Sequence, residues 1–189
     1  MLTEVITDAI VLDKEDFREQ DGRIHLYTKD IGKIIAKTVS SRKILSKLSA
    51  HLEPMNLVTA RLVSRGDGFS GQGFQLVDAL SHGQARIIKG DPQDLANAIR
   101  VFGLISRSIP SGVPDGELWD FLEAIRSGTS RVSLHQALHT LGFNSRFARC
   151  EICDRTQPEY FSPGENFFIC TACTFNADRY GADFVKLAI

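Results

Sequence analysis

The sequence lacks any apolar run long enough to cross a bilayer, and it lacks the basic flank and apolar core of a secretory signal. A membrane-spanning helix needs about 20 consecutive apolar residues, and a signal peptide needs positive charge ahead of its apolar stretch. The chain opens with Met1-Leu2-Thr3-Glu4 instead. We therefore expect a globular protein of the cytoplasm with no membrane partner.

Motifs of the common enzyme classes are missing as well. The sequence has no nucleophile elbow, no Walker loop and no dinucleotide fingerprint. Residues 66–71 match the spacing GxGxxG, but they join two expected strands and open no helix. His135 and His139 have the spacing of a zinc-protease pair, yet Gln136 stands where that motif has glutamate. We therefore expect a protein that is not an enzyme.

Cysteine is scarce, and its few positions are paired. Cys150, Cys153, Cys170 and Cys173 form two CxxC pairs with sixteen residues between them. Two tight turns at this spacing can direct four thiolates at one Zn²⁺ ion, and a reducing compartment favours metal binding over a disulfide. Four thiolates leave no open coordination position, so the pattern predicts a structural metal. A redox-active pair of the thioredoxin type is the alternative, although no βαβ pattern lies nearby.

The net charge is small, at −1 from 22 basic and 23 acidic residues, but its distribution is uneven. From Lys29 to Lys47 the chain carries six basic residues against Asp30 alone. Such a cluster on a small barrel indicates a groove for a phosphate backbone, with a merely solvated face as the alternative. The predicted nucleic-acid contacts of this cluster are Lys33, Lys37, Arg42, Lys43 and Lys47.

Aromatic side chains make up only 8% of the chain, so few are available to stack on bases. Tyr27, Phe69 and Phe74 are the candidates, although Phe74 alternates like a core residue. Backbone contacts should then outweigh stacking, and sequence specificity should be low.

Alternating apolar residues predict a barrel in the first eighty residues. In residues 23–28, Ile24 and Leu26 fall on one face while Arg23 and His25 fall on the other. Strands are expected at residues 6–12, 23–28, 31–39, 57–63 and 74–80, with a short basic helix at 41–50. Five strands with one helix between the third and fourth are typical of an OB-fold, although periodicity alone also permits another small β-barrel.

After His82, the spacing of the apolar residues changes from that of strands to that of helices. Asp91 and Pro92 predict the start of a helix over residues 92–108, and Ser130 is expected to cap a later helix that ends at Gly142. Aromatic residues around a Ser-Pro-Gly turn predict a hairpin between the two CxxC pairs. The expected class is α+β, with an OB-fold domain at 1–80 and a helical domain at 81–189 that carries a zinc module at 149–175.

Several segments resemble the RecO family of bacterial recombination proteins. The N-terminal likeness lies in residues 8–12, 21–28, 32–33, 42–43 and 53–54. It resumes at residues 138–143 and continues through Cys150-Glu151-Ile152-Cys153, Tyr160-Phe161-Ser162-Pro163 and Cys170-Thr171-Ala172-Cys173. These blocks cover most of the chain and stand in the order of the family.

This resemblance implies a non-enzymatic mediator of DNA repair and recombination. Family members bind single-stranded and duplex DNA, anneal complementary strands, and with RecR help RecA displace single-strand-binding protein. The resemblance adds Arg61 to the DNA contacts named above, makes the four-cysteine zinc site structural, and implies a location at the nucleoid. Such chains usually continue with several helices after the second CxxC, whereas sixteen residues follow here, so we expect a reduced or truncated member.

Two other classes of function remain open from the sequence. One is a zinc-containing protein-interaction adaptor whose barrel is a passive scaffold. The other is an OB-fold protein that binds RNA through the same groove, without annealing activity.

Overall fold

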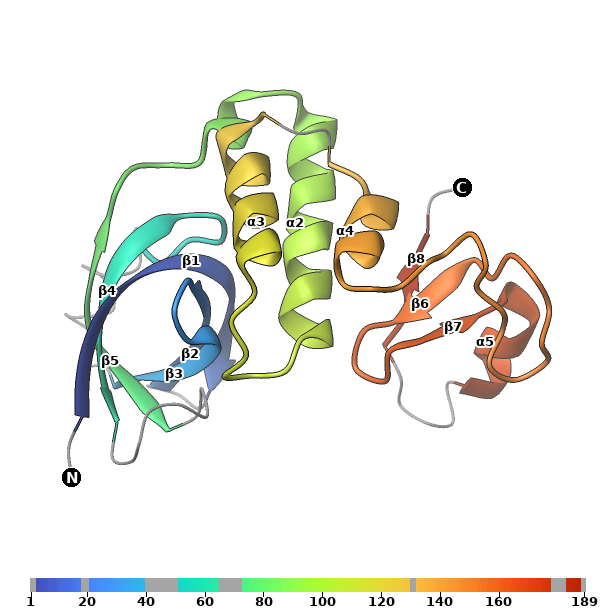
Figure 1. Ribbon diagram of the computed structural model, residues 1–189, viewed down its shortest axis with the longest axis horizontal. Helices are drawn as coiled ribbons and strands as arrows, with labels where there is room; N and C mark the ends of the chain where they lie inside the picture. The colour runs from blue at the N-terminus through green and yellow to red at the C-terminus, as the bar shows by residue number, and fades with distance from the viewer. Residues whose placement is uncertain are drawn as a thin grey trace.

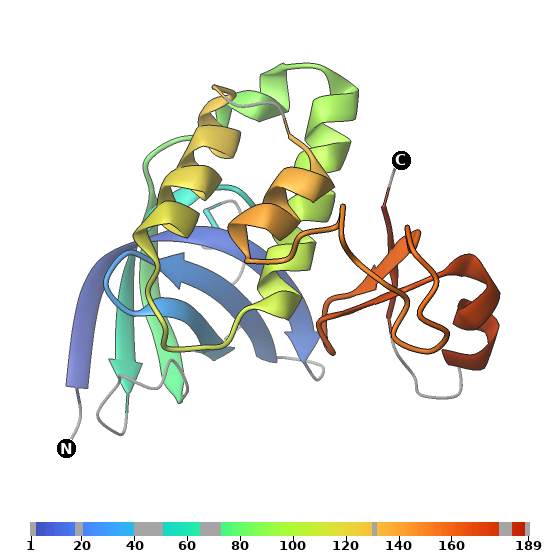
Figure 2. The ribbon, with the colours of Figure 1, turned by 45° about the vertical axis from the view of Figure 1, so that its right-hand side comes forward.

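The computed structural model describes residues 3–17, 21–39, 51–64, 73–129, 132–177 and 183–187. A β-barrel, a group of helices and a C-terminal module follow one another along the long axis of the molecule (Figure 1). The helices stand between the barrel and the module, as a second view confirms (Figure 2). Within the described residues, no helix has the length and apolar character needed to span a membrane.

Five strands close the N-terminal barrel. They are β1 (Thr3–Phe17), β2 (Asp21–Thr28), β3 (Gly32–Val39), β4 (Leu57–Ser64) and β5 (Phe74–Ser81). Their order is β1-β2-β3-β5-β4, with β1 antiparallel to both β2 and β4, and only the β3–β5 pair parallel. The arrangement is consistent with the expected OB-fold. The helix predicted at residues 41–50 lies outside the described residues.

The inner faces of the strands agree with the predicted alternation. Ile24 and Leu26 of β2 and Ile34 and Ala36 of β3 are all buried in the cluster that fills the barrel. The long strand β1 shifts register between Val11 and Asp13, an irregularity of the bulge type that lets one strand bend around two neighbours. Side chains on the outer face of β2 and β3 therefore remain for other contacts.

The helices follow the barrel as a small group. They are the short 3₁₀ helix η1 (Arg86–Lys89), α2 (Pro92–Ser108), α3 (Gly116–Ser127) and α4 (Leu134–Thr140). The prediction for α2 is confirmed, because Asp91 Oδ1 accepts a hydrogen bond from the Gln93 backbone N–H at 2.7 Å and so caps the helix. The prediction that Ser130 caps the helix expected to end at Gly142 is wrong. α4 begins at Leu134 after an extended Ser133, so it is one turn shorter than expected.

The C-terminal module contains the predicted hairpin and two elements that were not predicted. Strands β6 (Tyr160–Ser162) and β7 (Phe167–Ile169) form the hairpin. Helix α5 (Thr171–Ala177) starts within the second CxxC pair, and β8 (Val185–Lys186) pairs with β6. The short strand β8 has too few residues to show an alternating pattern in the sequence.

One hydrophobic cluster joins all three parts. Ile10 and Tyr27 of the barrel belong to the same cluster as Phe102 of α2, Phe161 of β6 and Leu187 next to β8. Burial of apolar surface therefore links the barrel to the helices and the helices to the module. A separate domain boundary at residue 80 remains a prediction.

The segment after α2 crosses the turn between β2 and β3 in close contact. The Gly112 N–H donates to the Lys33 carbonyl at 3.0 Å, and the Asp115 N–H donates to Tyr27 Oη at 2.8 Å. Gly32 lies under this crossing with φ +77°, and a Cβ atom there would meet the Val113 carbonyl oxygen at 2.1 Å. Glycine is therefore required at this position both by backbone conformation and by space.

We expect Gly32→Ala to destabilise the protein more than Gly128→Ala does. Gly128 has a similar φ of +72° but no atom within 4 Å of an added Cβ, so its replacement measures conformational strain alone. Such strain costs about 1–3 kcal/mol, and Gly32→Ala should exceed it because the crossing segment must also move. Urea titration of the full chain measures both free energies of unfolding. Equal losses would contradict the close crossing.

Candidate metal centre and nucleic-acid surface

The four cysteines gather at one point of the C-terminal module. Their sulfur atoms all lie within 4.8 Å of one another, and Cys153 Sγ lies 3.7 Å from Cys170 Sγ. Zinc–sulfur bonds of about 2.3 Å in a tetrahedron place the sulfurs about 3.8 Å apart. The cluster can therefore hold a metal ion with only small adjustment, and it is the one such group of side chains found among the described residues.

Two different local structures present the two CxxC pairs. After the first pair, Asp154 adopts φ +56° and its N–H donates to the Cys150 carbonyl at 2.9 Å, as expected for a residue that tolerates this conformation. The second pair leads into α5, where the Thr174 N–H donates to the Cys170 carbonyl at 3.2 Å. A residue after a CxxC pair can require a positive φ, which threonine disfavours. Thr174 is helical and does not adopt one.

The surroundings of the sulfurs shift the pKa values of two thiols in opposite directions. Burial opposes ionisation of Cys150, but backbone hydrogen bonds from Cys170, Cys153 and Ile152 outweigh it and lower the pKa of this thiol to about 6. Burial and then the neighbouring sulfurs raise the pKa of Cys173 to about 12. Four adjacent thiols cannot all ionise without a cation between them, so the donor set suits a thiophilic metal.

Other contacts fix the module around this cluster. The Thr171 N–H at the start of α5 donates to Glu159 Oε2 at 2.9 Å, and Ile169 is fully buried beside the sulfurs. Rings of Phe143, Phe161 and Phe168 stack between α4 and the hairpin, with centroid distances of 5.0 Å from Phe161 to each of the other two. If the four thiolates bind one tetrahedral metal ion, they fill its coordination sphere and leave no open position.

The predicted nucleic-acid surface lies on the other side of the molecule, on the outer face of β2 and β3. Cross-strand partners on this face are Arg23 with Lys37, His25 with Ile35, and Tyr27 with Lys33. Helix α2 and the segment after it cover one end of the face. The other end, at the Arg23–Lys37 pair, remains open.

Lys33 does not reach the surface, contrary to the expectation that it lies with Lys37 in a solvent-facing groove. Its side chain is buried under α2, where Nζ donates to the Ser106 carbonyl at 2.7 Å. His25 Nδ1 lies 2.8 Å from Ser106 Oγ in the same contact. Burial lowers the pKa of Lys33, with Glu15 opposing the shift, and burial likewise lowers the pKa of His25. Alternation predicted the correct face, but not the helix that covers it.

Two of the proposed stacking residues are buried as well. Tyr27 is 1% exposed, and its hydroxyl donates to the Asp115 carbonyl at 3.1 Å. Phe74 is also 1% exposed and fills the barrel, as its alternation suggested. Phe69 lies outside the described residues. Neither Tyr27 nor Phe74 is positioned to stack on a base.

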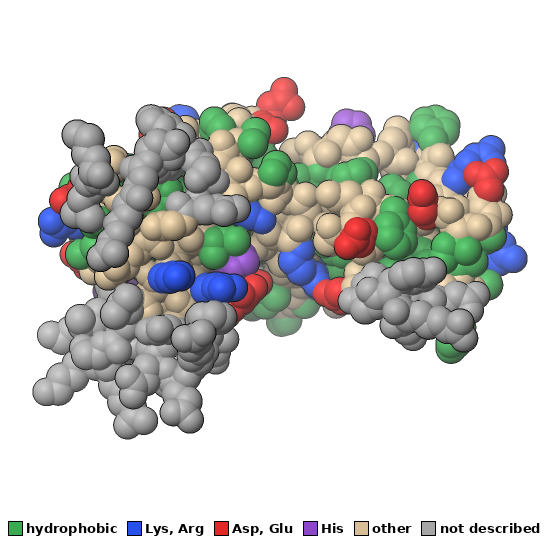
Figure 3. All heavy atoms as spheres, turned by 90° about the horizontal axis from the view of Figure 1, so that it is seen from below, with side chains coloured by type: hydrophobic (Ala, Val, Ile, Leu, Met, Phe, Trp, Pro, Cys, Tyr) green, Lys and Arg blue, Asp and Glu red, His purple; other side chains and the backbone are tan. Residues whose placement is uncertain are grey.

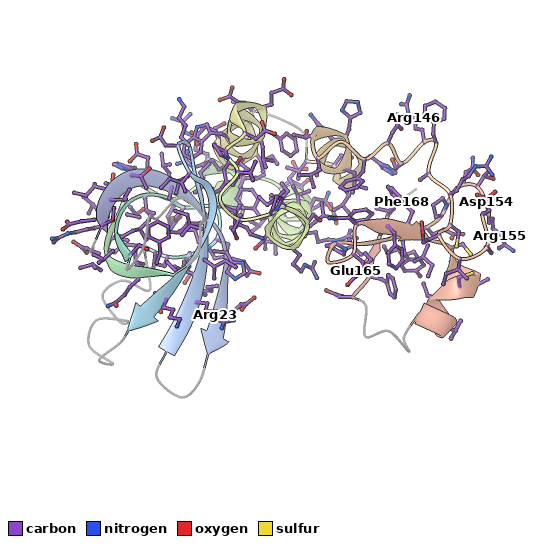
Figure 4. The ribbon with its side chains drawn as sticks, turned by 60° about the horizontal axis from the view of Figure 1, so that its bottom comes forward. Arg23, Arg146, Asp154, Arg155, Glu165 and Phe168 are labelled. Atoms are coloured by element: carbon purple, nitrogen blue, oxygen red, sulfur yellow. The ribbon has the colours of Figure 1, made fainter. Side chains whose placement is uncertain are left out.

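Arg23 and Lys37 border a hollow of about 210 Å³ on the barrel surface. Ile35, Gly73 and Phe74 complete its lining. Figure 4 shows Arg23 on β2, away from the helices, and Figure 3 shows basic side chains grouped on this part of the barrel. Arg23 was not among the predicted site residues. The strict alternation and the hairpin register could have found it, since they place it directly opposite Lys37.

Of the remaining predicted contacts, only Arg61 lies within the described residues, and it is not at this hollow. Arg42, Lys43 and Lys47 lie outside the described residues. Arg61 lies on β4, which is separated from β2 by β1 and from β3 by β5. Its Nε donates to Glu4 Oε1 at 2.6 Å, and this contact lowers the pKa of Glu4. Arg61 thus belongs to a different face of the barrel from Arg23 and Lys37.

The sequence is similar to one family model and to several known proteins. Residues 1–72 match the family model described as Recombination protein O N terminal. The chain is 29% identical over 166 residues to the DNA repair protein RecO of Streptococcus gordonii, covering 82% of this chain and 61% of the relative. It is 27% identical to the RecO protein of Geobacter metallireducens, over 93% of this chain and 73% of the relative. Its identity to RecO from Listeria monocytogenes is 28%, over 92% of this chain and 69% of the relative.

The likeness therefore extends well beyond the barrel, into the helices and the cysteine module. The chain spans 61%, 73% and 69% of the lengths of these three relatives. A matching N-terminal family model, several relatives of one name and a closed barrel of the expected type agree with each other. The N-terminal part of this chain thus matches the RecO N-terminal family model, and the chain is similar over most of its length to proteins named DNA repair protein RecO.

Proposed function

We propose that this protein is a DNA-binding recombination mediator, without enzymatic activity, that promotes annealing of single strands and loading of RecA during DNA repair. The observation that carries the proposal is the Arg23–Lys37 pair beside an open hollow on a barrel of OB type. The relatives are named DNA repair proteins, which favours DNA over RNA as the polyanion.

The proposed mechanism is charge neutralisation. Arg23 and Lys37 contact phosphates across the β2–β3 pair, and Arg42, Lys43 and Lys47 are proposed to extend this contact along the strand. Lys37 is exposed and takes part in no ion pair within the described part of the chain. With Tyr27 and Phe74 buried, backbone contacts dominate and sequence preference is weak. Reduced phosphate repulsion then lets complementary bases meet.

Zn²⁺ is the metal we propose for the four-cysteine cluster. Cys150, Cys153, Cys170 and Cys173 would saturate it, and its contribution would be structural. Binding would fix the first CxxC turn against the start of α5 and so hold the hairpin on α4. A RecR-like protein and single-strand-binding protein are the further partners we propose, and the protein would act at the nucleoid in the cytoplasm.

Removal of zinc should unfold the module and leave the barrel folded. We expect one zinc per chain, lost on treatment with a chelator, because binding contributes about 10–16 kcal/mol in small modules of this kind. Hydrogen exchange should then accelerate in residues 149–177 and stay slow in β1–β5. Cobalt substitution should give the absorption spectrum of a tetrahedral thiolate site.

Cys170→Ser should abolish that cobalt spectrum, whereas Ser162→Ala in the same hairpin should retain it. Ser162 contributes no ligand and its hydroxyl has no hydrogen-bond partner within the described residues. A metal content unaffected by Cys170→Ser would rule out the four-cysteine site.

Arg23→Ala and Lys37→Ala should each weaken binding of single-stranded DNA. For about five or six phosphate contacts the log–log slope of affinity against salt is near −4, and loss of one contact should make it shallower by about 0.7. Fluorescence anisotropy of a labelled strand at several salt concentrations measures both quantities. A matched RNA strand in competition tests the preference for DNA.

Arg61→Ala is the matched control, since it removes the same positive charge from another face of the barrel. It should leave the affinity nearly unchanged. If all three variants lose affinity equally, binding is not localised to β2 and β3. If the wild-type protein shows no binding at low salt, the proposed function is wrong and a protein-interaction adaptor becomes the better account.

A further inference from the structure

Helix α4 and the loop after it lie on the far side of α2 and α3 from the barrel (Figure 1). Arg126 and Arg149 form ion pairs with Glu123 and Asp154, whereas no ion pair of Arg146 is found within the described residues. Between Ala124 and Cys150 the chain carries four arginines and two histidines, and it has no aspartate or glutamate. A stretch of this length without a carboxylate stands out in a chain with as many acidic as basic residues. Part of it folds into α4 and the loop that leads from α4 to the cysteine module.

This loop and α4 line a surface hollow of about 560 Å³. Its lining residues are His135, Gln136, His139, Phe143, Asn144, Ser145 and Arg146, and none of them is acidic. His135 Nδ1 lies 2.7 Å from Ser145 Oγ, which ties the loop to the helix. Basic, amide and hydroxyl groups therefore face one concave surface with hydrogen-bond donors.

The hollow is held in shape by the packing beneath it. The Phe143 N–H donates to the Leu138 carbonyl at 2.8 Å, and the Phe143 ring stacks on Phe161 of the hairpin. Asn144 Oδ1 accepts a hydrogen bond from the backbone N–H of Arg146 at 3.1 Å. These contacts fix the backbone of the loop from which Arg146 projects.

An exposed aromatic ring adjoins the arginine. Phe147 is 81% exposed, which is unusual for a residue of this size in a packed loop. Figure 4 shows Arg146 projecting outward from this loop, distant from Arg23 on the barrel. Phosphate recognition by arginine with base stacking on a neighbouring ring is the common physical basis of single-strand binding.

We propose that this hollow is a second contact site for single-stranded nucleic acid, in which Arg146 binds a phosphate and Phe147 stacks on a base. The site rests on the proposed function and deepens it, because a protein that anneals strands has to hold two of them. The hollow at Arg23 and Lys37 takes one strand, and the hollow at α4 takes the other or a distant part of the same strand.

A metal site at the histidine pair is a poorer account of the same residues. His135 Nδ1 is already engaged with Ser145, and the lining offers no carboxylate or thiolate as a third ligand. The four-cysteine cluster is the only group of three or more potential ligands found in the described residues. The absence of acidic side chains around the hollow favours an anion over a cation.

The test separates binding of one strand from bridging of two. Two non-complementary strands carrying a donor and an acceptor dye should show energy transfer in the presence of the wild-type protein. Arg146→Ala should reduce this bridging, and the rate of annealing, about tenfold, while affinity for one strand changes less than about twofold. Arg86→Ala, which removes another exposed arginine, from η1, should have no effect.

A second measurement does not depend on any variant. Strands carrying 5-iodouracil should photo-cross-link to Phe147 in the wild-type chain, with the site found by mass spectrometry. Wild-type DNA binding with no cross-link to residues 143–149 and equal bridging by both arginine variants would overturn this second site alone. Displacement of DNA from Arg146 by an oligo-aspartate peptide, without a cross-link, would instead indicate a protein-docking surface and also overturn it. Absence of all DNA binding would refute the proposed function itself.

Discussion

The docking of α2 on the outside of the barrel, against β1 and over part of β2 and β3, determines which basic side chains remain exposed. Phe102 and Ile105 of α2 share one apolar cluster with Ile10 and Tyr27 of the barrel. At the edge of this cluster, the Ser106 carbonyl accepts a hydrogen bond from the Lys33 ammonium. Burial of that ammonium opposes its charged form, so the apolar contact around it has to supply the stability. The docking closes half of a basic strand face and leaves the other half open.

The metal cluster and the proposed DNA contacts are separated in space but connected through packing. The four sulfurs lie where the first CxxC turn meets α5, the hairpin between the pairs carries Phe161, and Phe161 packs against Phe143 of the loop after α4. A structural metal can in this way influence a charged surface that it does not touch. The Arg23–Lys37 pair needs no such support, because its two strands belong to a closed barrel.

Local patterns predicted most elements but not what covers them. The alternation in β2 and β3, the cap at Asp91 and the two CxxC pairs are contained in short stretches of sequence, so they could be recognised there. The burial of Lys33 depends on a helix more than seventy residues away, and no local period encodes that contact. The start of α4 was predicted about a turn too early because Ser130 is a residue type that commonly caps helices. Strand β8 was not predicted because two residues are too few to show an alternating pattern.

Helix α2 buries Lys33 and leaves Lys37 exposed on the same strand, where we propose that it contacts DNA. Acetylation of the native full-length chain, followed by mass spectrometry, measures the accessibility of Lys33 and Lys37 in one experiment. The account predicts that Lys37 reacts readily and is protected by single-stranded DNA, while Lys33 remains unmodified with and without DNA. Rapid modification of Lys33, with DNA protecting both lysines alike, would contradict it.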